Sequence, residues 1–252
     1  MSSFFKGSFN KIDHAFVQSK NDFERFFEAG IDRDAMSVSG SIKFDIDLMA
    51  LKNFTENEVN YYKEKYLFVC GSTHPGEEEI LIDSFIDLNK DNKHLVLAPR
   101  HPERFGEIKE LVNKKNLSNI LYTEISSNPD IKSDVTIVDV IGRLLDFYEI
   151  ADCVFIGGTL VDHGGQNFLE PAFFNKPIIS GRSTYNFDEI SKKLSDLGLL
   201  KLVSNKDEIS SVVENIEAIS DSLKKDINLW LNENRGASKF ISKKVCKEFN
   251  LV

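Results

Sequence analysis

The chain has 252 residues, and 40 acidic side chains outnumber 31 basic ones, so the net charge of −9 argues against unselective binding to nucleic acid. Hydrophobic residues at 41%, charged residues at 28% and only three scattered cysteines are typical of a reduced, cytoplasmic globular protein without a disulfide framework. No run reaches the ~18 apolar residues that a spanning helix needs, and the first residues lack the features of a signal peptide. We therefore expect a chain that neither spans a membrane nor is exported.

The first 45 residues have the pattern of a small α/β remnant. The sequence predicts short strands over 15–19 and 36–38 and, between them, a helix over 21–29 that ends at Gly30. One helix and two short strands cannot bury a core of their own. We therefore assign residues 1–45 to the remnant of an amino-terminal domain, and the polar stretch that follows to a linker or a helix start.

Residues 46–252 alternate between short apolar runs and amphipathic stretches of helical length, which indicates a parallel sheet covered by helices. The predicted strands are 66–71, 94–98, 119–123, 135–140, 153–158, 177–180 and 199–203. The predicted helices are 77–89, 102–115, 165–175 and 186–198, and two or three more from Ile209 onward. Because βα units follow the right-handed crossover rule, we expect a Rossmann-like, doubly wound α/β domain with a helical tail over 46–252.

Several side chains are assigned structural roles. Phenylalanines at helical spacing, thiols within apolar strands and one histidine are expected in the core: Phe23, Phe26, Phe27, Cys70, Cys153 and His94. The lysines of the last helix are expected to form a solvated face, and the weaker alternative is peripheral contact with an anionic bilayer surface. They are Lys239, Lys243, Lys244 and Lys247.

The segment STHPGEEE, residues 72–79, links a strand to a helix and so would lie at the carboxyl edge of the sheet, where ligands bind. The simplest interpretation is helix capping by Ser72 or Thr73, with the three glutamates complementing the helix dipole. The alternative is a donor-binding loop that includes Ser72 and His74. A metal site at His74 with Glu77 or Glu78 is weaker still, because no second cluster of His or Cys lies at ligand spacing.

The next strand ends in PRHPER, residues 99–104, which places two guanidinium groups and an imidazole just past its carboxyl end. Arginine meets phosphate oxygens through a rigid fork, so we expect Arg100 to bind an anion. Arg104 could serve either as a ligand or as an exposed residue of a helix that starts with Pro102.

The segment 153–181 has the strongest pattern. A strand ends in Gly157-Gly158, a loop holds Gly164-Gly165, and a helix is expected to begin at Gln166-Asn167. Glycines let backbone approach a ligand and a helix start presents unpaired N–H groups, so we predict a phosphate site here. Glu170 is placed to accept from sugar hydroxyls. For either glycine pair alone, a role in turn formation would be sufficient.

Four blocks in this order and spacing resemble a known family: GSIKFD (40–45), STHPGEEE (72–79), PRHPERF (99–105) and FIGGTLVDHGGQNFLEPA (155–172). They look like the carboxyl-terminal half of the 3-deoxy-D-manno-octulosonic acid (Kdo) transferases, GT-B glycosyltransferases of lipopolysaccharide assembly. The resemblance implies transfer of Kdo from CMP-Kdo to the lipid A precursor, without a metal cofactor, at the cytoplasmic face of the inner membrane.

The resemblance also implies roles for individual residues. The implied contacts with CMP are Pro99, Arg100, Ile141, Gly142, Arg143, Asn167, Phe168, Leu169 and Glu170. Lys43 matches the lysine of the family's GNLKFD block and is implied to stabilise charge in the transition state, a role that fits the charge developing on the leaving phosphate.

The chain also departs from the family. Arg143 stands where the family usually has Glu, so only the backbone part of that contact carries over. Gln166 stands where a His often precedes the Asn, and Phe168 replaces a common Pro.

No residue here matches the family's catalytic glutamate base, which belongs to the amino-terminal domain. We therefore expect a truncated or split form that binds nucleotide but is inactive alone, with the missing half as a separate chain. Phe4, Phe5 and Phe9 near the start favour some partner, because a severed domain exposes apolar surface. The alternatives are another GT-B enzyme that uses a UDP-sugar, and a non-catalytic nucleotide-binding module that needs a partner chain.

Overall fold

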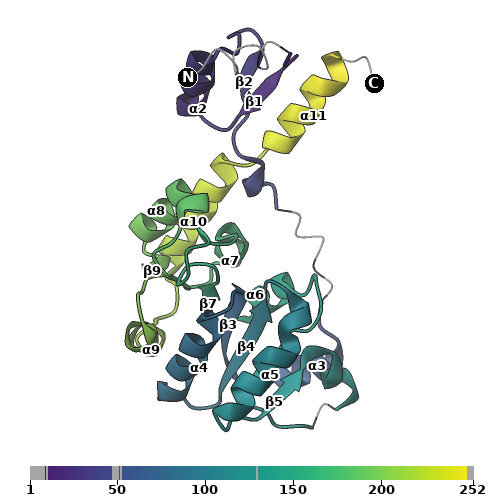
Figure 1. Cartoon of the computed structure of the whole chain (residues 1–252), viewed down its shortest axis with the longest axis vertical. Helices are drawn as coiled ribbons and strands as arrows, with labels where there is room; N and C mark the ends of the chain where they lie inside the picture. Colours follow the sequence, from purple (N-terminus) through teal and green to yellow (C-terminus); the bar gives the residue numbers. More distant parts are fainter. Residues whose placement is uncertain (1–8, 10, 47–50, 52, 129, 249–252) are drawn as a thin grey trace. The chain divides into compact units, whose positions relative to one another are not determined.

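The computed structural model describes residues 9, 11–46, 51, 53–128 and 130–248 (Figure 1). The chain divides into two compact units: the described residues before 48 together with those from Asn228 on, and the residues between them. Phe4 and Phe5 lie outside the described residues, whereas Phe9 is described and half-buried. None of the helices in these ranges is long and apolar enough to cross a lipid bilayer.

The first unit begins with a two-stranded parallel sheet. Its elements are β1 (Ala15–Val17), α2 (Lys20–Ala29), β2 (Met36–Val38) and the 3-10 helix η1 (Ile42–Phe44). The Ser19 hydroxyl accepts from the N–H of Asp22 and so caps α2. These elements confirm the predicted strands and helix to within two residues.

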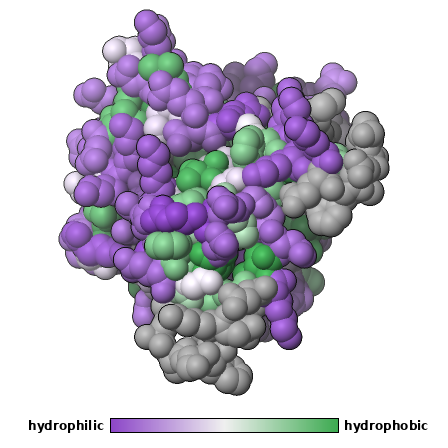
Figure 2. Space-filling model, turned by 90° about the horizontal axis from the view of Figure 1, so that it is seen from above, coloured by the Kyte–Doolittle hydropathy of each residue, from purple (hydrophilic) through white to green (hydrophobic). Residues whose placement is uncertain are grey.

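The phenylalanines of α2 are not core residues, so that prediction is wrong for two of them. Phe26 and Phe27 are 41% and 42% exposed, and Phe23 is half-buried. The guanidinium of Arg33 lies 4.0 Å from the centroid of the Phe27 ring and covers part of it. The face seen in Figure 2 is mainly hydrophilic, with small groups of hydrophobic residues between polar ones. The short sheet of this unit offers too little apolar surface to bury a whole helical stripe.

The last part of the helical tail packs with the first unit, whereas the sequence placed it with the second domain. The tail comprises α9 (Lys206–Glu214), α10 (Asp221–Glu233) and α11 (Ala237–Glu248). The Asp45 carboxylate accepts from the N–H groups of Gly236 and Ser238 at the start of α11, and Phe44 packs edge-on against Trp230, 5.3 Å between ring centroids. These contacts between residues far apart in sequence leave no local signal.

The basic face of α11 is only partly solvated. The Lys244 ammonium donates to Ser37 Oγ at 2.5 Å and lies 3.0 Å from His14 Nε2, so this lysine binds the first unit's own sheet. The other three lysines are exposed as predicted: Lys239, Lys243 and Lys247.

The second unit is built on a seven-stranded parallel sheet with the order β5-β6-β4-β3-β7-β8-β9. Its strands are β3 (Tyr66–Thr73), β4 (Lys93–Pro99), β5 (Asn119–Leu121), β6 (Val135–Ile137), β7 (Cys153–Ile156), β8 (Ile178–Ser180) and β9 (Leu200–Leu202). Its helices before the tail are α3 (Glu56–Tyr62), α4 (Glu77–Asp87), α5 (Phe105–Lys114), α6 (Leu144–Ile150), α7 (Leu169–Phe173) and α8 (Asp188–Leu197). The 3-10 helices are η3 (Pro102–Arg104), η4 (Tyr122–Ser127) and η5 (Tyr185–Phe187). The predicted doubly wound α/β fold and all seven predicted strands are confirmed.

Alternate residues of the central strands face opposite layers of helices. On one face Phe68, Leu95 and Phe155 pack with apolar residues of α4, α5 and α9. On the other face Tyr148 of α6 lies so close to Gly71 that a Cβ there would overlap its hydroxyl. Cys70 and Cys153 are fully buried, and burial raises the pKa of both thiols, as expected of inert core residues.

His94 is a buried histidine on the same face as α3. Its Nδ1 lies 3.0 Å from the carbonyl of Ser133 and its Nε2 lies 2.8 Å from the hydroxyl of Thr136, so the neutral ring donates to the carbonyl and accepts from the hydroxyl. Burial, with a smaller contribution from the charge of Lys65, lowers its pKa to about 3.

Acid should therefore destabilise the second unit through His94. Between pH 6.5 and about 3 the unfolded imidazole binds a proton that the folded one does not, so the free energy of unfolding should fall with pH by up to about 1.4 kcal/mol per unit from this group. Urea denaturation at a series of pH values measures this slope. His94→Gln should flatten it, and His101→Gln, at an exposed histidine, should not. Equal slopes for all three proteins would contradict the assignment.

Candidate functional site

The carboxyl edge of the sheet gathers the loops that the sequence singled out. The loops after β6, β4, β3 and β7 follow one another there, because these strands are neighbours in the parallel sheet. The chain passes from β3 to β4 on one side and returns to β7 on the other, so the β3–β7 junction is a topological switch point. Open α/β sheets bind ligands at such points.

One buried carboxylate joins the two loops at this junction. Glu77 is fully buried, and its Oε2 accepts from the N–H groups of His74 at 2.9 Å and Gly158 at 2.7 Å. Its Oε1 accepts from the N–H groups of Thr159 and Leu160, both at 2.9 Å. The helix cap itself is Gly76, without a side-chain hydrogen bond, so neither Ser72 nor Thr73 caps α4 as the sequence suggested.

The glycine amides that were expected to bind phosphate are occupied by protein acceptors. The N–H of Gly157 donates to Gly71, that of Gly158 to Glu77, that of Gly164 to Ser183 Oγ, and that of Gly165 to Gly158. The following helix, α7, starts at Leu169 and has only five residues, shorter than the predicted 165–175. These four amides are therefore not available to a phosphate in this structure, and the phosphate site at this segment stays a prediction.

Two of these glycines are required by packing. A Cβ on Gly157 would overlap the backbone of Ser72, which itself adopts a left-handed φ of 56°. A Cβ on Gly164, at φ 76°, would overlap the Tyr185 ring. These glycines permit close approach of backbone to protein, which is the turn-forming alternative that the sequence left open.

His74 lies at the rim of the junction. Its ring stacks on that of His163 with 4.3 Å between centroids, and the Gln166 amide nitrogen lies 3.3 Å from His74 Nε2. Burial first, and then the neighbouring His163 and His101, lower the pKa of His74, and the charges of two glutamates oppose the shift only in part. The ring is therefore neutral near pH 7 and can donate through Nδ1.

The two arginines after β4 have different roles. Arg100 is exposed and none of the described residues pairs with its guanidinium, while its N–H donates to the carbonyl of Thr73. Arg104 instead binds buried Glu78 at 2.8 Å and Glu107 at 3.2 Å. Arg100 is thus available to an anion and Arg104 holds α4 and α5 together, which decides the question that the sequence left open for Arg104.

In the loop after β6 the side chain of Ile141 is exposed, whereas that of Arg143 is buried. Ile141 is 82% exposed and Gly142 has a φ of 84°. The Arg143 guanidinium is buried, 3.1 Å from Asp146 and 3.8 Å from Glu58, and lies over the rings of Phe54 and Tyr122. Burial alone would raise the pKa of Glu58, but hydrogen bonds from Tyr122 and Thr55 and the charge of Arg143 hold it below its usual value. The Arg143 side chain is thus held by buried carboxylates and is not free to bind a ligand.

The segment from Asn167 to Glu170 presents few side chains. Phe168 and Leu169 are fully buried, so neither residue presents surface to a ligand in this structure. The Asn167 amide donates to Glu170 Oε1 at 3.0 Å and its oxygen accepts from the N–H of Leu169 at 3.1 Å. Burial raises the pKa of Glu170, opposed in part by this amide.

The last two predicted site residues, Pro99 and Lys43, belong to different units. Pro99 is the buried last residue of β4, directly before Arg100. Lys43 lies in η1 of the first unit with an exposed side chain, and partial desolvation lowers its pKa. Within the described ranges, no three His, Cys, Asp or Glu side chains converge as metal ligands. Sequence reasoning did not single out His163, although the loops after β3, β4 and β7 hold three of the five histidines.

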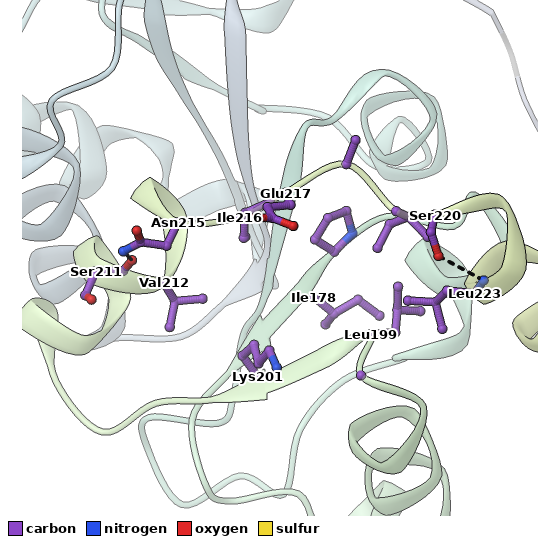
Figure 3. Close-up of a pocket in the computed structure, with 14 residues that line it drawn as sticks. Ile178, Leu199, Lys201, Ser211, Val212, Asn215, Ile216, Glu217, Ser220 and Leu223 are labelled. Carbon is purple, nitrogen blue, oxygen red and sulfur yellow. Dashed lines mark hydrogen bonds between the residues drawn. The ribbon is translucent and has the colours of Figure 1, made fainter.

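A pocket of about 530 Å³ lies at the opposite edge of the sheet, where β8 and β9 begin (Figure 3). Ile178 and Leu199 form its base, and Val212 and Ile216 face them from α9 and the segment after it. Its lining is mainly apolar, and it contains none of the residues that the sequence assigned to the nucleotide.

Solved structures share this fold. The C-terminal CMP-Kdo binding domain of WaaA from Acinetobacter baumannii matches 62% of this chain and 82% of its own, with 26% identity and a TM-score of 0.55. The S. aureus MnaA–UDP structure matches 95% of this chain and 62% of its own, with 17% identity and a TM-score of 0.57, a likeness of fold alone. The second unit is thus a Rossmann-like domain of the GT-B glycosyltransferase type.

The sequence comparisons identify the relatives. A family model for 3-deoxy-D-manno-octulosonic-acid transferase matches residues 1–46. The chain is 33% identical to a bifunctional glycosyltransferase/methyltransferase of Fusobacterium nucleatum over 98% of this chain and 38% of that protein. It is 32% identical to a 3-deoxy-D-manno-octulosonic acid transferase of Haemophilus influenzae over 85% of this chain and 52% of that protein. The chain therefore belongs to the Kdo transferase family. It spans about half the length, or less, of these curated proteins.

Arg143 provides a test of this architecture. Arg143→Met should lower the free energy of unfolding by about 3 kcal/mol or more, because Glu58 and Asp146 would stay buried without their cation. Arg100→Met, at an exposed position, should change it by less than about 0.5 kcal/mol. Urea denaturation measures both values. An Arg143→Met protein as stable as the unaltered chain would show that Arg143 does not hold the loop.

Proposed function

We propose that the chain is the donor-binding part of a Kdo transferase, which transfers Kdo from CMP-Kdo to the lipid A precursor. The observation that carries this proposal is the match of 62% of this chain, at 26% identity, to a CMP-Kdo binding domain. The open guanidinium of Arg100 at that site supports an anionic ligand.

In this proposal CMP lies along the carboxyl edge between the loops after β3, β4, β6 and β7. Arg100 binds the phosphate, and the backbone from Ile141 to Arg143 borders the nucleoside. The half-buried carboxylate of Glu170, to which the Asn167 amide donates, accepts from the ribose hydroxyls. Lys43 would stabilise the charge that develops as the bond between Kdo and phosphate breaks.

The proposal includes the wider setting of the reaction. Transfer is proposed to need no metal, because the cations of the chain would neutralise the leaving phosphate. The proposed location is the cytoplasmic face of the inner membrane, where the exposed lysines of α11, Lys239, Lys243 and Lys247, could meet an anionic lipid surface. The base and the acceptor surface are proposed to come from a further part, since the curated relatives extend well beyond the length matched here.

Calorimetry with nucleotides tests donor binding. The chain should bind CMP in preference to UDP, and Arg100→Ala should weaken CMP binding by roughly 1.5–3 kcal/mol, the usual size of a lost charge-assisted contact. Arg25→Ala, at an 82% exposed arginine of the first unit, is the matched control and should leave affinity unchanged. A preference for UDP would favour a UDP-sugar enzyme, and unchanged affinity in Arg100→Ala would place the phosphate elsewhere.

A transfer assay tests whether this part acts alone. The purified chain with CMP-Kdo and lipid A precursor should show no turnover above background, because no residue here is assigned the role of the base. Kdo-lipid product is measured by mass spectrometry, with an intact Kdo transferase as the positive control. Turnover by the chain alone would refute the proposed dependence on a further part.

A further inference from the structure

Glu77 has a bonding pattern that helix capping does not explain. It is fully buried at the start of α4, and no described residue forms an ion pair with it. A buried charge without a cation is costly unless hydrogen bonds replace its hydration. Four backbone N–H groups supply them, one from its own loop and three from the loop after β7.

The three N–H groups from the second loop belong to consecutive residues, Gly158, Thr159 and Leu160, and all point at one carboxylate. Consecutive amides aimed at one point are the arrangement with which loops bind phosphate or other anions. We call the amides of residues 158–160 the amide nest. In this chain the nest already holds an anion, and that anion is a side chain from the neighbouring loop.

Further contacts connect the amide nest and Glu77 to the residues at the carboxyl edge of the sheet, Arg100 and His74. The N–H of Arg100 donates to the carbonyl of Thr73, and the N–H of Gly165 donates to the carbonyl of Gly158. His74, whose own N–H donates to Glu77, stacks on His163 in the loop after β7. Moving the Glu77 carboxylate would therefore move the backbone that carries Arg100 and His74.

From this geometry we infer that Glu77 is a positioning residue and the resident anion of the amide nest. This inference rests on the proposed function, since the ligand that it positions is the nucleotide phosphate of the donor. The carboxylate keeps the nest filled with and without nucleotide, and the phosphate is bound at the rim by side chains, Arg100 and His74, rather than by the amides of the glycine loop.

Hydrogen–deuterium exchange on the unaltered chain tests whether the Glu77 carboxylate occupies the amide nest in the absence of nucleotide. The amides of residues 158–160 should exchange as slowly as those of the central strands in the absence of nucleotide, and CMP should not change their rates. Fast exchange that becomes slow only with CMP would show that the phosphate fills the nest, and it would overturn the inference.

Chemical rescue tests positioning. Glu77→Ala should weaken CMP binding at least about tenfold, because the empty nest releases both loops. Acetate, which matches the deleted group, should restore much of the affinity, and chloride at the same ionic strength should not. Glu79→Ala removes an exposed glutamate of the same helical turn and should have no effect. Calorimetry gives the affinities, and the thermal midpoint with and without acetate reports refilling of the nest.

The outcomes separate this inference from the proposed function. If the unaltered chain binds no CMP, the proposed function fails, while the exchange rates still decide whether Glu77 fills the nest. If CMP binds equally well to the unaltered chain and to Glu77→Ala, the positioning role fails and the proposed function stands. If Glu77→Ala does not fold, the exchange experiment on the unaltered chain decides alone.

Discussion

Four backbone amides converge on the Glu77 carboxylate, and the loops at the carboxyl edge of the sheet are joined through this interaction. A parallel sheet positions the ends of its strands but does not restrain the loops that leave them. At the β3–β7 junction a buried charge supplies that restraint, because it can remain buried only while every one of its donors stays in place. These hydrogen bonds join the loop that carries His74 to the loop that carries His163.

This constraint changes which groups are available to a ligand. The glycine amides serve the fold, and the groups that remain open are side chains from the loops after β3 and β4. Three arginines illustrate the selection. Arg104 and Arg143 lie against buried carboxylates and hold helices and loops together, whereas Arg100 has no such partner among the described residues. A charge is available for binding only where the fold leaves it unneutralised.

The sequence predicted the strands well because each buried strand is a short apolar run with no competing helical period, as in 66–71 and 153–158. It predicted α2 and the start of α4 from apolar residues at helical spacing and from the glycines that border these helices. It did not predict α6, whose seven residues form too short a window for a clear helical period, and it overextended α7. The sequence also did not predict the position of the last helix, since the contacts of Asp45 at the start of α11 join residues 191 and 193 positions apart.

The amino-acid sequence by itself therefore determined the α/β class, the parallel sheet and the set of loops that carry the site. The spacing of apolar residues decides between helix and strand within a short segment, and the crossover rule fixes how successive parallel strands are connected. A chain with these short apolar runs has few other folds in which to bury them. Only the tertiary structure decided which residues of those loops face a ligand. Glu77 and Arg143 each bind one partner three residues away and others that lie 80 or more residues away in sequence. The energy of such a buried charge therefore depends on contacts that only the folded chain brings together.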